Sequence, residues 1–361
     1  MRGYTAEEKA WIWLDGIEKL TWRQKEKIAA LTGGPLSVLR GIEERKGELC
    51  KALSPEEYDL LKTTLQDKDY FPRVLTELEE KEIVCVTRAS SDYPELLSRI
   101  PAPPHVLYCK GNVGLLKKDK FAVVGSRKTL AWASRLGEEW TREIAKHFAI
   151  VTGLAEGGDA AAIRGALDSG NLVCALAHGT DHVYPAAHTG IFKEVAQRGL
   201  LITEHRPSVA PQKYFFPVRN RIIAGLCRGI LVLSAGERSG ACITANYGAD
   251  YGRDVFAVPY APNIASGKGC NALIKKGAYL ADGVEDILSR YGIEEKKEEP
   301  PALDSVEEKI VAFLRENGEA HISKIAEAAA LPVFAAGGTL SVLEMKGYIV
   351  RLGGNRFAAV R

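Results

Sequence analysis

Residues 121–129 read FAVVGSRKT, an apolar strand-like run that ends in a glycine turn carrying serine and arginine. Similar runs recur along the chain, and helical patterns such as Leu130–His147 lie between them. The further runs are Ala149–Thr152, Leu172–Ala177, Leu200–Thr203, Ile230–Leu233 and Val255–Val258. Near-continuous apolar strands that alternate with helices are typical of a parallel sheet covered on both faces. The sequence therefore predicts an α/β core built on a parallel sheet.

The region before this core has a helical pattern. Residues 1–70 are expected to form a small helical domain of the SAM or helix-hairpin-helix type, with Ser54-Pro55 as an N-cap and first turn. The core itself is assigned to residues 80–290. It begins with two lead-in strands, Ile83–Val86 and Val106–Cys109.

The region after the core divides into a linker and a third domain. Residues 293–304, IEEKKEEPPALD, are charged and contain prolines, which indicates a solvated linker. Residues 305–361 show three helical patterns followed by two short strands around Gly353-Gly354-Asn355. The helical patterns are Val306–Glu316, Ile322–Ala330 and Val333–Lys346. This order predicts a winged-helix domain.

Composition limits the classes of function. The chain has 361 residues and a net charge of only +2, so nucleic-acid binding would have to come from a local patch. Its 7 cysteines are scattered without a C-x-x-C pair, which favours a reducing, cytoplasmic location. The sequence contains no long uncharged apolar run, so no membrane span is predicted.

Three turns in the core combine glycine or proline with serine, asparagine or arginine near predicted helix starts. They are Gly125-Ser126-Arg127, Arg219-Asn220-Arg221 after Pro217, and Ser239-Gly240, where Ser239 is a candidate N-cap. In open α/β sheets, ligands bind beyond the carboxyl ends of the strands, where backbone N–H groups at helix starts favour anions. Arginine adds a planar fork for phosphate oxygens. With no matching acid–base pair, the pattern indicates a phosphate-rich ligand that is held rather than cleaved.

The second turn lies in FFPVRNRIIAGL, residues 215–226. Cations at the positive end of a helix are unfavourable unless an anion binds there, so Arg219 and Arg221 are expected to face the ligand. Phe215 and Phe216 precede them and either stack on bases or pack in the core. Core packing is expected to claim one of the two rings.

Other chemistry has weaker support. No G-x-G-x-x-G motif is present, so no dinucleotide cofactor is expected. Asp159 is interpreted as the N-cap of a helix over Ala160–Asp168 rather than as an acid or base. His178, His182 and His188 lie in one segment, but loop histidines without a cysteine pair are more often structural than metal ligands. No catalytic residue, metal site or cofactor is assigned.

Six motifs together resemble the DNA-processing protein A family, also called DprA or Smf. In chain order they are VVGSR, GLAEGGDAAAIRGAL, DHVYP, FFPVRNRIIAGL, SGACITANYGADYGRDVFAVP and GCNALIKKGA. The resemblance covers about residues 83–288 in the order usual for the family, and the FPxRNRIIAGL pattern is highly specific. The helical and winged-helix domains on either side also suit the family.

The resemblance implies an extended Rossmann-like core that binds single-stranded DNA (ssDNA) without being an enzyme. Family members act as homodimers that protect incoming ssDNA in natural transformation and load the RecA recombinase onto it, so ssDNA, RecA and a second copy are the expected partners. By motif position, the DNA-contacting residues carry over to Gly125, Ser126, Arg127, Arg219, Asn220, Arg221, Ser239 and Gly240, and also to Lys213 and Phe216 just before the arginines.

The chain departs from the usual family pattern at six positions, which are Glu156, Gly158, Ile163, His188, Ser234 and Tyr260. Glu156 stands where the family usually has arginine, beside the expected DNA path. It is therefore expected to lower DNA affinity or to alter the path of the strand. The arginine–asparagine–arginine sequence at 219–221 is intact, so ssDNA binding is still predicted.

The third helix of the C-terminal domain is poor in side chains that recognise DNA. Its only basic residue is Lys346, so we expect it to contact protein, with Arg351 and Arg356 available for weak phosphate contact. Two other functions stay open for the core: a small-nucleotide sensor and a phosphoribohydrolase-like enzyme. The enzyme group carries P-G-G-x-G-T and a following glutamate, where residues 234–245 of this chain are SAGERSGACITA.

Overall fold

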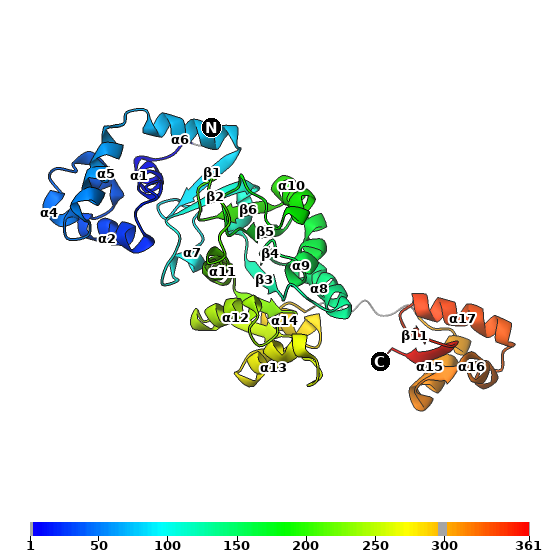
Figure 1. Ribbon diagram of the computed structural model, residues 1–361. Helices are drawn as coiled ribbons and strands as arrows, with labels where there is room; N and C mark the ends of the chain where they lie inside the picture. The colour runs from blue at the N-terminus through cyan, green and yellow to red at the C-terminus, as the bar shows by residue number, and fades with distance from the viewer. Residues whose placement is uncertain (1–2, 295–301, 361) are drawn as a thin grey trace. The chain divides into compact units, whose positions relative to one another are not determined.

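The computed structural model describes residues 3–294 and 302–360, which fall into two compact units, Met1–Gly292 and Ile293–Arg361 (Figure 1). The expected linker at 293–304 lies mostly outside the described residues. The expected boundaries of the helical domain, at 1–70, and of the core, at 80–290, stay predictions, because both segments belong to the first unit.

Within the described residues, nine strands of the first unit form one sheet in the order β1-β2-β6-β5-β4-β3-β7-β8-β9. The strands are β1 (Ile83–Thr87), β2 (Val106–Gly111), β3 (Lys120–Val124), β4 (Ala149–Thr152), β5 (Leu172–Ala175), β6 (Leu200–Thr203), β7 (Gly229–Val232), β8 (Asp254–Ala257) and β9 (Tyr279–Leu280). From β6 through β3 to β9 every neighbouring pair is parallel, whereas β1 and β2 are antiparallel additions beside β6. The predicted α/β class with a Rossmann-like parallel sheet is confirmed.

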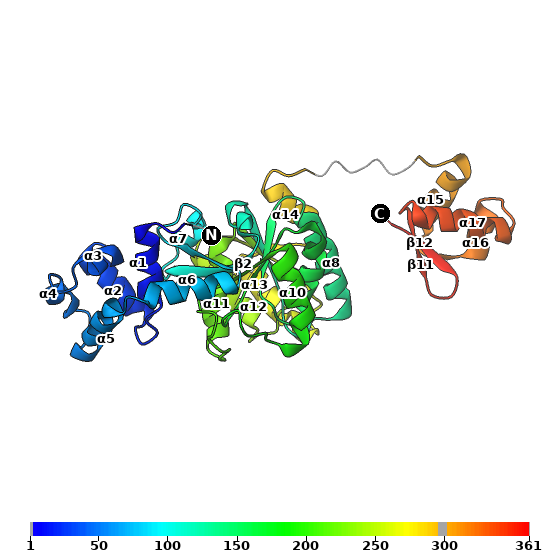
Figure 2. The same ribbon diagram turned by 90° about the horizontal axis from the view of Figure 1, so that it is seen from above.

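Both faces of the sheet are covered, which explains why its central strands are almost entirely apolar. Every residue of β3 to β7 is buried. Helices α8 to α10 cover one face, and α11 to α13 cover the other (Figures 1 and 2). The helices of the core are α7 (Glu95–Ser98), α8 (Ala131–Ile144), α9 (Gly158–Ala166), α10 (Thr189–Arg198), α11 (Phe215–Leu226), α12 (Gly240–Asp250), α13 (Lys268–Lys275) and α14 (Val284–Arg290).

The N-terminal helices share a hydrophobic cluster with the first two strands. They are α1 (Ala6–Asp15), α2 (Trp22–Thr32), α3 (Pro35–Arg40), α4 (Lys46–Leu49), α5 (Pro55–Gln66) and α6 (Tyr70–Glu80). The cluster joins Trp13 and Leu61 to Cys85 and Tyr108. Ser54 caps α5 as predicted, with its side chain accepting from the N–H of Glu57. This segment therefore packs directly on the edge of the sheet.

The second unit has a hydrophobic core of its own. It contains α15 (Ser305–Asn317), β10 (Ala320–His321), α16 (Ile322–Ala328), α17 (Val333–Met345), β11 (Ile349–Leu352) and β12 (Arg356–Ala359). The hairpin turn contains Gly354 and Asn355 with positive φ, and the short β10 adds a third strand that was not predicted. Three helices with a hairpin confirm the winged-helix prediction.

None of the helices in the described ranges 3–294 and 302–360 is by itself long and apolar enough to cross a membrane. The bent pair α16 and α17, with 98° between them, passes the length and composition test only jointly.

Candidate nucleic-acid interface

The carboxyl ends of four strands outline the candidate site. β3 ends before Gly125, β4 before Gly153, β5 before Leu176 and β7 before Leu233. The chain runs outward from β3 to β6 on one side and then returns to place β7 on the other side of β3. Ligands of open α/β sheets bind at such a reversal of strand order, because two neighbouring connections leave in opposite directions and open a crevice.

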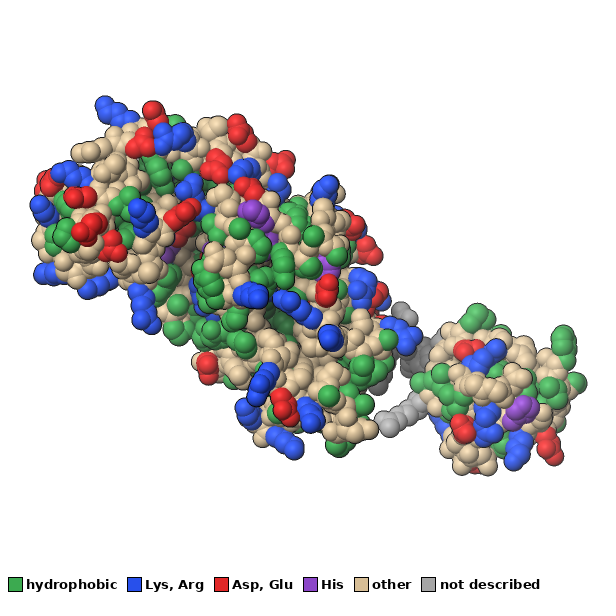
Figure 3. All heavy atoms as spheres, viewed as in Figure 1, with side chains coloured by type: hydrophobic (Ala, Val, Ile, Leu, Met, Phe, Trp, Pro, Cys, Tyr) green, Lys and Arg blue, Asp and Glu red, His purple; other side chains and the backbone are tan. Residues whose placement is uncertain are grey.

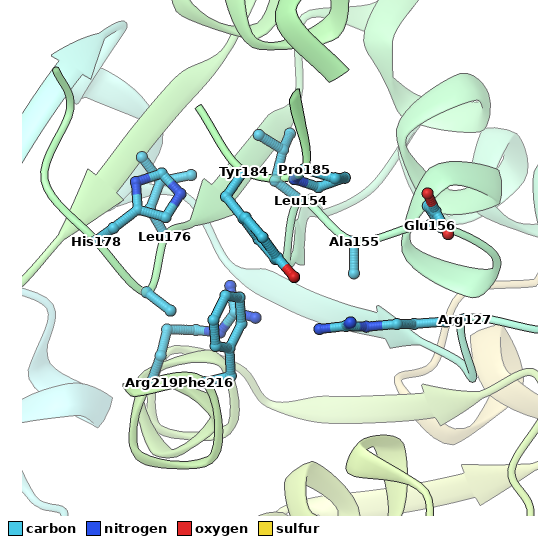
Figure 4. Close-up of a pocket in the computed structure, with 11 residues that line it drawn as sticks. Arg127, Leu154, Ala155, Glu156, Leu176, His178, Tyr184, Pro185, Phe216 and Arg219 are labelled. Atoms are coloured by element: carbon cyan, nitrogen blue, oxygen red, sulfur yellow. The ribbon is translucent and has the colours of Figure 1, made fainter. Parts of the chain in front are cut away.

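A cavity of about 270 Å³ opens beyond β4 and β5. Apolar and aromatic walls with two cations surround it: Arg127, Leu154, Leu176, Tyr184, Pro185, Phe216 and Arg219. Figure 4 shows Arg127 reaching in from one side, with Phe216 and Arg219 rising from α11 on the other. The rings of Tyr184 and Phe216 lie 5.3 Å apart between centroids. Such walls suit a planar base with a phosphate beside it.

A larger cavity of about 660 Å³ adjoins it over β3 and the start of α12. Its lining is mostly small or polar and includes Ser126, Lys128, Asn220, Arg238, Ser239 and Gly240. The two cavities share Arg127, Ala155 and Phe216. The Arg127 guanidinium lies 5.7 Å from the centroid of the Phe216 ring, so one cation–aromatic pair separates the two spaces. Together they form one continuous groove.

The turn that carries Arg127 is fixed by a buried serine. The backbone N–H of Ser126 donates to the carbonyl oxygen of Ser234 at 2.9 Å, and the Thr129 hydroxyl lies 2.7 Å from the Ser234 hydroxyl. Gly125 packs on Gly158 so closely that a Cβ built on Gly158 would lie 2.3 Å from the Gly125 Cα. The hydroxyl that the departure to Ser234 supplies also accepts from the Ser126 N–H at 3.2 Å and so helps to position the turn.

Arg219 lies at the floor of the small cavity and is only 6% exposed. It donates to the carbonyl oxygen of Ala175 and lies beside the buried carboxylate of Asp159, above Gly153. Burial lowers the pKa of the Arg219 guanidinium, and the charge of Asp159 opposes that shift. Burial likewise raises the pKa of Asp159, against the effect of Arg219. Arg219 therefore lines the cavity and also compensates a buried acid.

Arg221 faces a different part of the molecule. Residues two positions apart on a helix point about 200° from each other, so Arg219 and Arg221 diverge. Arg221 is buried and pairs with Glu204, away from both cavities. The expectation that the arginines stand at a helix start was wrong, because α11 begins at Phe215 and both lie in its second turn.

The remaining predicted residues are placed as follows. Asn220 donates to the carbonyl oxygen of Gly240 at 3.2 Å and so ties α11 to the start of α12. Ser239 is the N-cap of α12, as predicted, and accepts from the N–H of Ala241 at 3.3 Å. Lys213 is exposed just before α11 and lines neither cavity. The ring of Phe215 packs on His205, at 4.2 Å between centroids, and that of Phe216 faces the groove.

Three cations beside the groove have no acidic partner among residues 3–294 and 302–360. They are Arg127, Lys128 and Arg238, and all three are exposed. Figure 3 shows Lys and Arg side chains on both sides of a hollow over β3, α11 and α12. The N-terminus of α12 adds its partial positive charge at the same place. The groove is therefore a locally positive surface on a nearly neutral chain.

The structure corrects the interpretation of Asp159 and agrees with the structural role expected of the histidines. Asp159 is not an N-cap: α9 starts at Gly158 after Gly157, and the Asp159 carboxylate points inward and accepts from the N–H of Ala155 at 3.4 Å. The three histidines of the neighbouring segment each bond a backbone carbonyl oxygen: His178 that of Gly179, His182 that of Ser208 and His188 that of Leu154. His188 thereby holds the loop that forms one wall of the small cavity.

The other departures have distinct positions. Glu156 is exposed and lines the small cavity on the Arg127 side (Figure 4). Ile163 is buried in α9, where it adds to the core. The Tyr260 hydroxyl donates to the carbonyl oxygen of Leu233 at 2.8 Å and so braces the end of β7. Only Glu156 places a charge at the groove.

Several groove residues had not been predicted. Tyr184, Leu154 and Leu176 come from loops that follow other strands, and Lys128 and Arg238 flank two of the predicted turns. Lys128 and Arg238 are each adjacent to a predicted turn, so extending each turn by one residue would have found them. Tyr184 belongs to the DHVYP motif and could have been found there, although only the fold brings its ring to Phe216.

Comparison with known proteins identifies relatives over the whole core. A family model described as DNA recombination-mediator protein A matches residues 84–292, and one described as the DprA winged helix domain matches residues 294–355. The DNA processing protein DprA of Streptococcus pneumoniae is 40% identical over 200 residues, which cover 55% of this chain and 71% of that protein. The protein Smf of Synechocystis is 36% identical over 228 residues, and the match spans 60% of this chain but only 56% of that protein's length.

Solved structures show the same fold. The X-ray structure of DNA processing protein A from Streptococcus pneumoniae has a TM-score of 0.66 at 31% identity, covering 78% of this chain and 97% of that one. DNA processing protein A from Helicobacter pylori, solved in a study of its single-stranded DNA binding mode, has a TM-score of 0.54 at 26% identity. That similarity covers 58% of this chain and 95% of the Helicobacter protein.

Proposed function

The chain belongs to the DNA recombination-mediator protein A family, and we propose that it binds ssDNA in the groove between α9, α11 and α12. The observation that carries the proposal is the cluster of Arg127, Lys128 and Arg238, which lack acidic partners among the described residues, beside the exposed edge of Phe216. Phosphates need such cations, and unpaired bases need an aromatic face. The relative from Helicobacter pylori, studied in a single-stranded DNA binding mode, supports the same ligand.

The shape of the groove favours single strands over duplex. The small cavity is lined by Leu154, Leu176 and the Tyr184 ring, and it has room for one base that has left its stack. A paired base cannot enter without being unstacked, which costs a few kcal/mol, whereas an ssDNA base enters freely. Binding is therefore expected to prefer ssDNA and to weaken as salt rises.

We propose a binding protein rather than an enzyme. The acid nearest the groove floor, Asp159, is buried against Arg219, and the histidines of the loop bond backbone carbonyl oxygens. These groups already have structural partners, which leaves Glu156 as the one exposed acid among the described residues that line the two cavities. Protection of incoming ssDNA in transformation, loading of RecA and a homodimeric state extend the same proposal, and they rest on family membership alone.

The test is fluorescence anisotropy with labelled ssDNA of increasing length at fixed salt. Arg127→Ala removes one exposed groove cation, so we expect a loss of about tenfold or more, since a charge-assisted hydrogen bond contributes roughly 1.5–3 kcal/mol. The matched control is Arg198→Ala, which removes an exposed arginine of α10 that pairs with Asp168 at 3.0 Å and lines neither cavity. It should bind like wild type. Equal affinities for all three proteins would refute the groove assignment.

The small cavity also supports a second candidate function, that of a mononucleotide sensor. Its volume of about 270 Å³ is large enough for one nucleoside. The two functions differ in their dependence on oligonucleotide length. An ssDNA-binding protein gains affinity with each added nucleotide until the groove is filled, whereas a sensor binds a mononucleotide as tightly as an oligonucleotide.

A further inference from the structure

Helix α17 has an apolar face that its own unit leaves uncovered. Ala336, Leu340 and Leu343 enter the hydrophobic core, but Phe334 is 95% exposed and Met345 is 81% exposed. Figure 3 shows hydrophobic side chains protruding along the edge that α17 occupies in Figure 1. Large apolar side chains on the outward face of a helix are normally covered, so this face indicates a missing partner.

The centre of the exposed face is a stripe of four residues, Phe334, Gly338, Ser341 and Met345, and the exposed Val342 lies beside it. Their spacings are four, three and four residues, which keeps them on one side of an α-helix. The two large side chains stand at the ends, and the two small residues lie between them. A Cβ added at Gly338 would meet nothing within 4 Å, so the centre of the stripe is an open hollow.

This stripe is unchanged when its direction is reversed: large, small, small, large, with the same spacings. An interface between two identical surfaces related by a two-fold axis requires such self-complementarity, because each residue must face its counterpart in both directions. With the axis between positions 339 and 340, Phe334 of one copy lies opposite Met345 of the other, and Gly338 lies opposite Ser341. We propose that α17 pairs antiparallel with α17 of a second copy of this chain.

The charges beside the stripe allow this pairing. Glu344 is bound to Arg351 at 3.6 Å, and Lys346 is bound to Glu307 at 2.7 Å. In the proposed register position 344 lies opposite Ala335, and position 346 lies opposite Val333, so no like charges meet. DNA is a poor alternative occupant, because the stripe offers no cation to a phosphate.

The contact is small. From Phe334 to Met345 the stripe extends about 16 Å, and one short helix face buries far less than the roughly 800 Å² per partner of a stable complex. The pairing is therefore weak between free chains and is populated when two copies are held together at an effective concentration near the millimolar range. Neighbouring copies bound to one nucleic-acid strand meet that condition, but the contact itself does not depend on the ssDNA proposal.

The first experiment traps the pair in the full chain. In the proposed register two Ser341 Cα atoms lie about 6 Å apart, within the span of a disulfide. Ser341→Cys should give a crosslinked dimer on a non-reducing gel under mild oxidation. The controls are the wild-type chain, which reports on the exposed native Cys50, and Glu316→Cys, an exposed position on α15. Crosslinking of Ser341→Cys no stronger than that of the controls overturns the proposal.

The second experiment tests the register in the Ser341→Cys background. Phe334→Glu alone and Met345→Lys alone should each reduce crosslinking severalfold, because each places an unpaired charge in an apolar contact. The double variant should recover it, since the introduced carboxylate then faces the introduced ammonium of the other copy. Within one helix these positions are about 16 Å apart and cannot pair. No recovery, with the circular dichroism spectrum unchanged, overturns the antiparallel arrangement.

Discussion

Arg219 is expected to affect stability as well as binding, which separates it from Arg127. Its guanidinium is 6% exposed, bonds the Ala175 carbonyl oxygen and faces the buried carboxylate of Asp159. Arg219→Ala would leave that carboxylate without a counter-charge in a buried site. Breaking a buried pair by removing one partner costs about 3–5 kcal/mol. Arg127 is exposed and has no ion pair among the described residues, so Arg127→Ala should change stability by less than about 0.5 kcal/mol.

The pH dependence of the loss follows from Asp159. Burial raises its pKa in the folded state, so the folded protein holds this proton more tightly than the unfolded chain does. The charged form therefore costs stability in full above the folded pKa, and that cost decreases as the pH falls and disappears below the pKa of the unfolded chain. The charge of Arg219 lowers the pKa of Asp159, so Arg219→Ala should raise this pKa further and increase the difference from the unfolded chain. The destabilisation by Arg219→Ala should therefore increase as the pH rises and decrease as the pH falls.

Urea unfolding followed by tryptophan fluorescence measures the stability of the first compact unit, which contains Arg219. All 5 tryptophans lie in that unit, before residue 141. They are Trp11, Trp13, Trp22, Trp132 and Trp140. Asp159→Asn in the Arg219→Ala background removes the unpaired charge and should restore about half or more of the lost free energy at high pH. Equal stability of the Arg127→Ala and Arg219→Ala proteins, or no recovery in the double variant, would refute the buried-pair reasoning.

Three further predictions concern the groove and its surroundings. Glu156→Arg replaces the acid at the edge of the small cavity with a cation and should tighten ssDNA binding, mainly at low salt; unchanged or weaker binding in an anisotropy titration would place the strand elsewhere. Ser234→Ala removes the hydroxyl that contacts Ser126 and Thr129, so ssDNA affinity should fall about fivefold with the fold intact by circular dichroism; wild-type affinity would show that the turn holds without it. Removal of residues 305–361 should leave ssDNA affinity within a few-fold of the full chain, because the groove lies wholly in the first unit; a hundredfold loss, about 2.7 kcal/mol, with the core still folded would make the winged helix a principal DNA-binding element.

The local sequence was sufficient to predict the strands of the core, because burial on both faces makes a strand almost continuously apolar. Each run from Phe121–Val124 to Val255–Val258 became a strand within a few residues of its predicted ends. It was insufficient for strand direction and neighbours: β1 and β2 carry the same apolar signal as the parallel strands but join the sheet antiparallel. Helix α6, which packs on β1, lies in the segment between the expected helical domain and the expected core, where no element was predicted.

For the site, the sequence marked the turns, and the tertiary structure assigned their roles. Glycine and serine at Gly125 and Ser239 follow from backbone geometry and capping, which are local, so both turns were recognised. Arg219 and Arg221 look equivalent in the sequence, but the helix turns them about 200° apart, toward a cavity and toward Glu204. The ring of Tyr184 reaches Phe216 only because strands of opposite connection direction meet beside β3. Local interactions determined the elements and turns, and the order of strands determined which side chains share the groove.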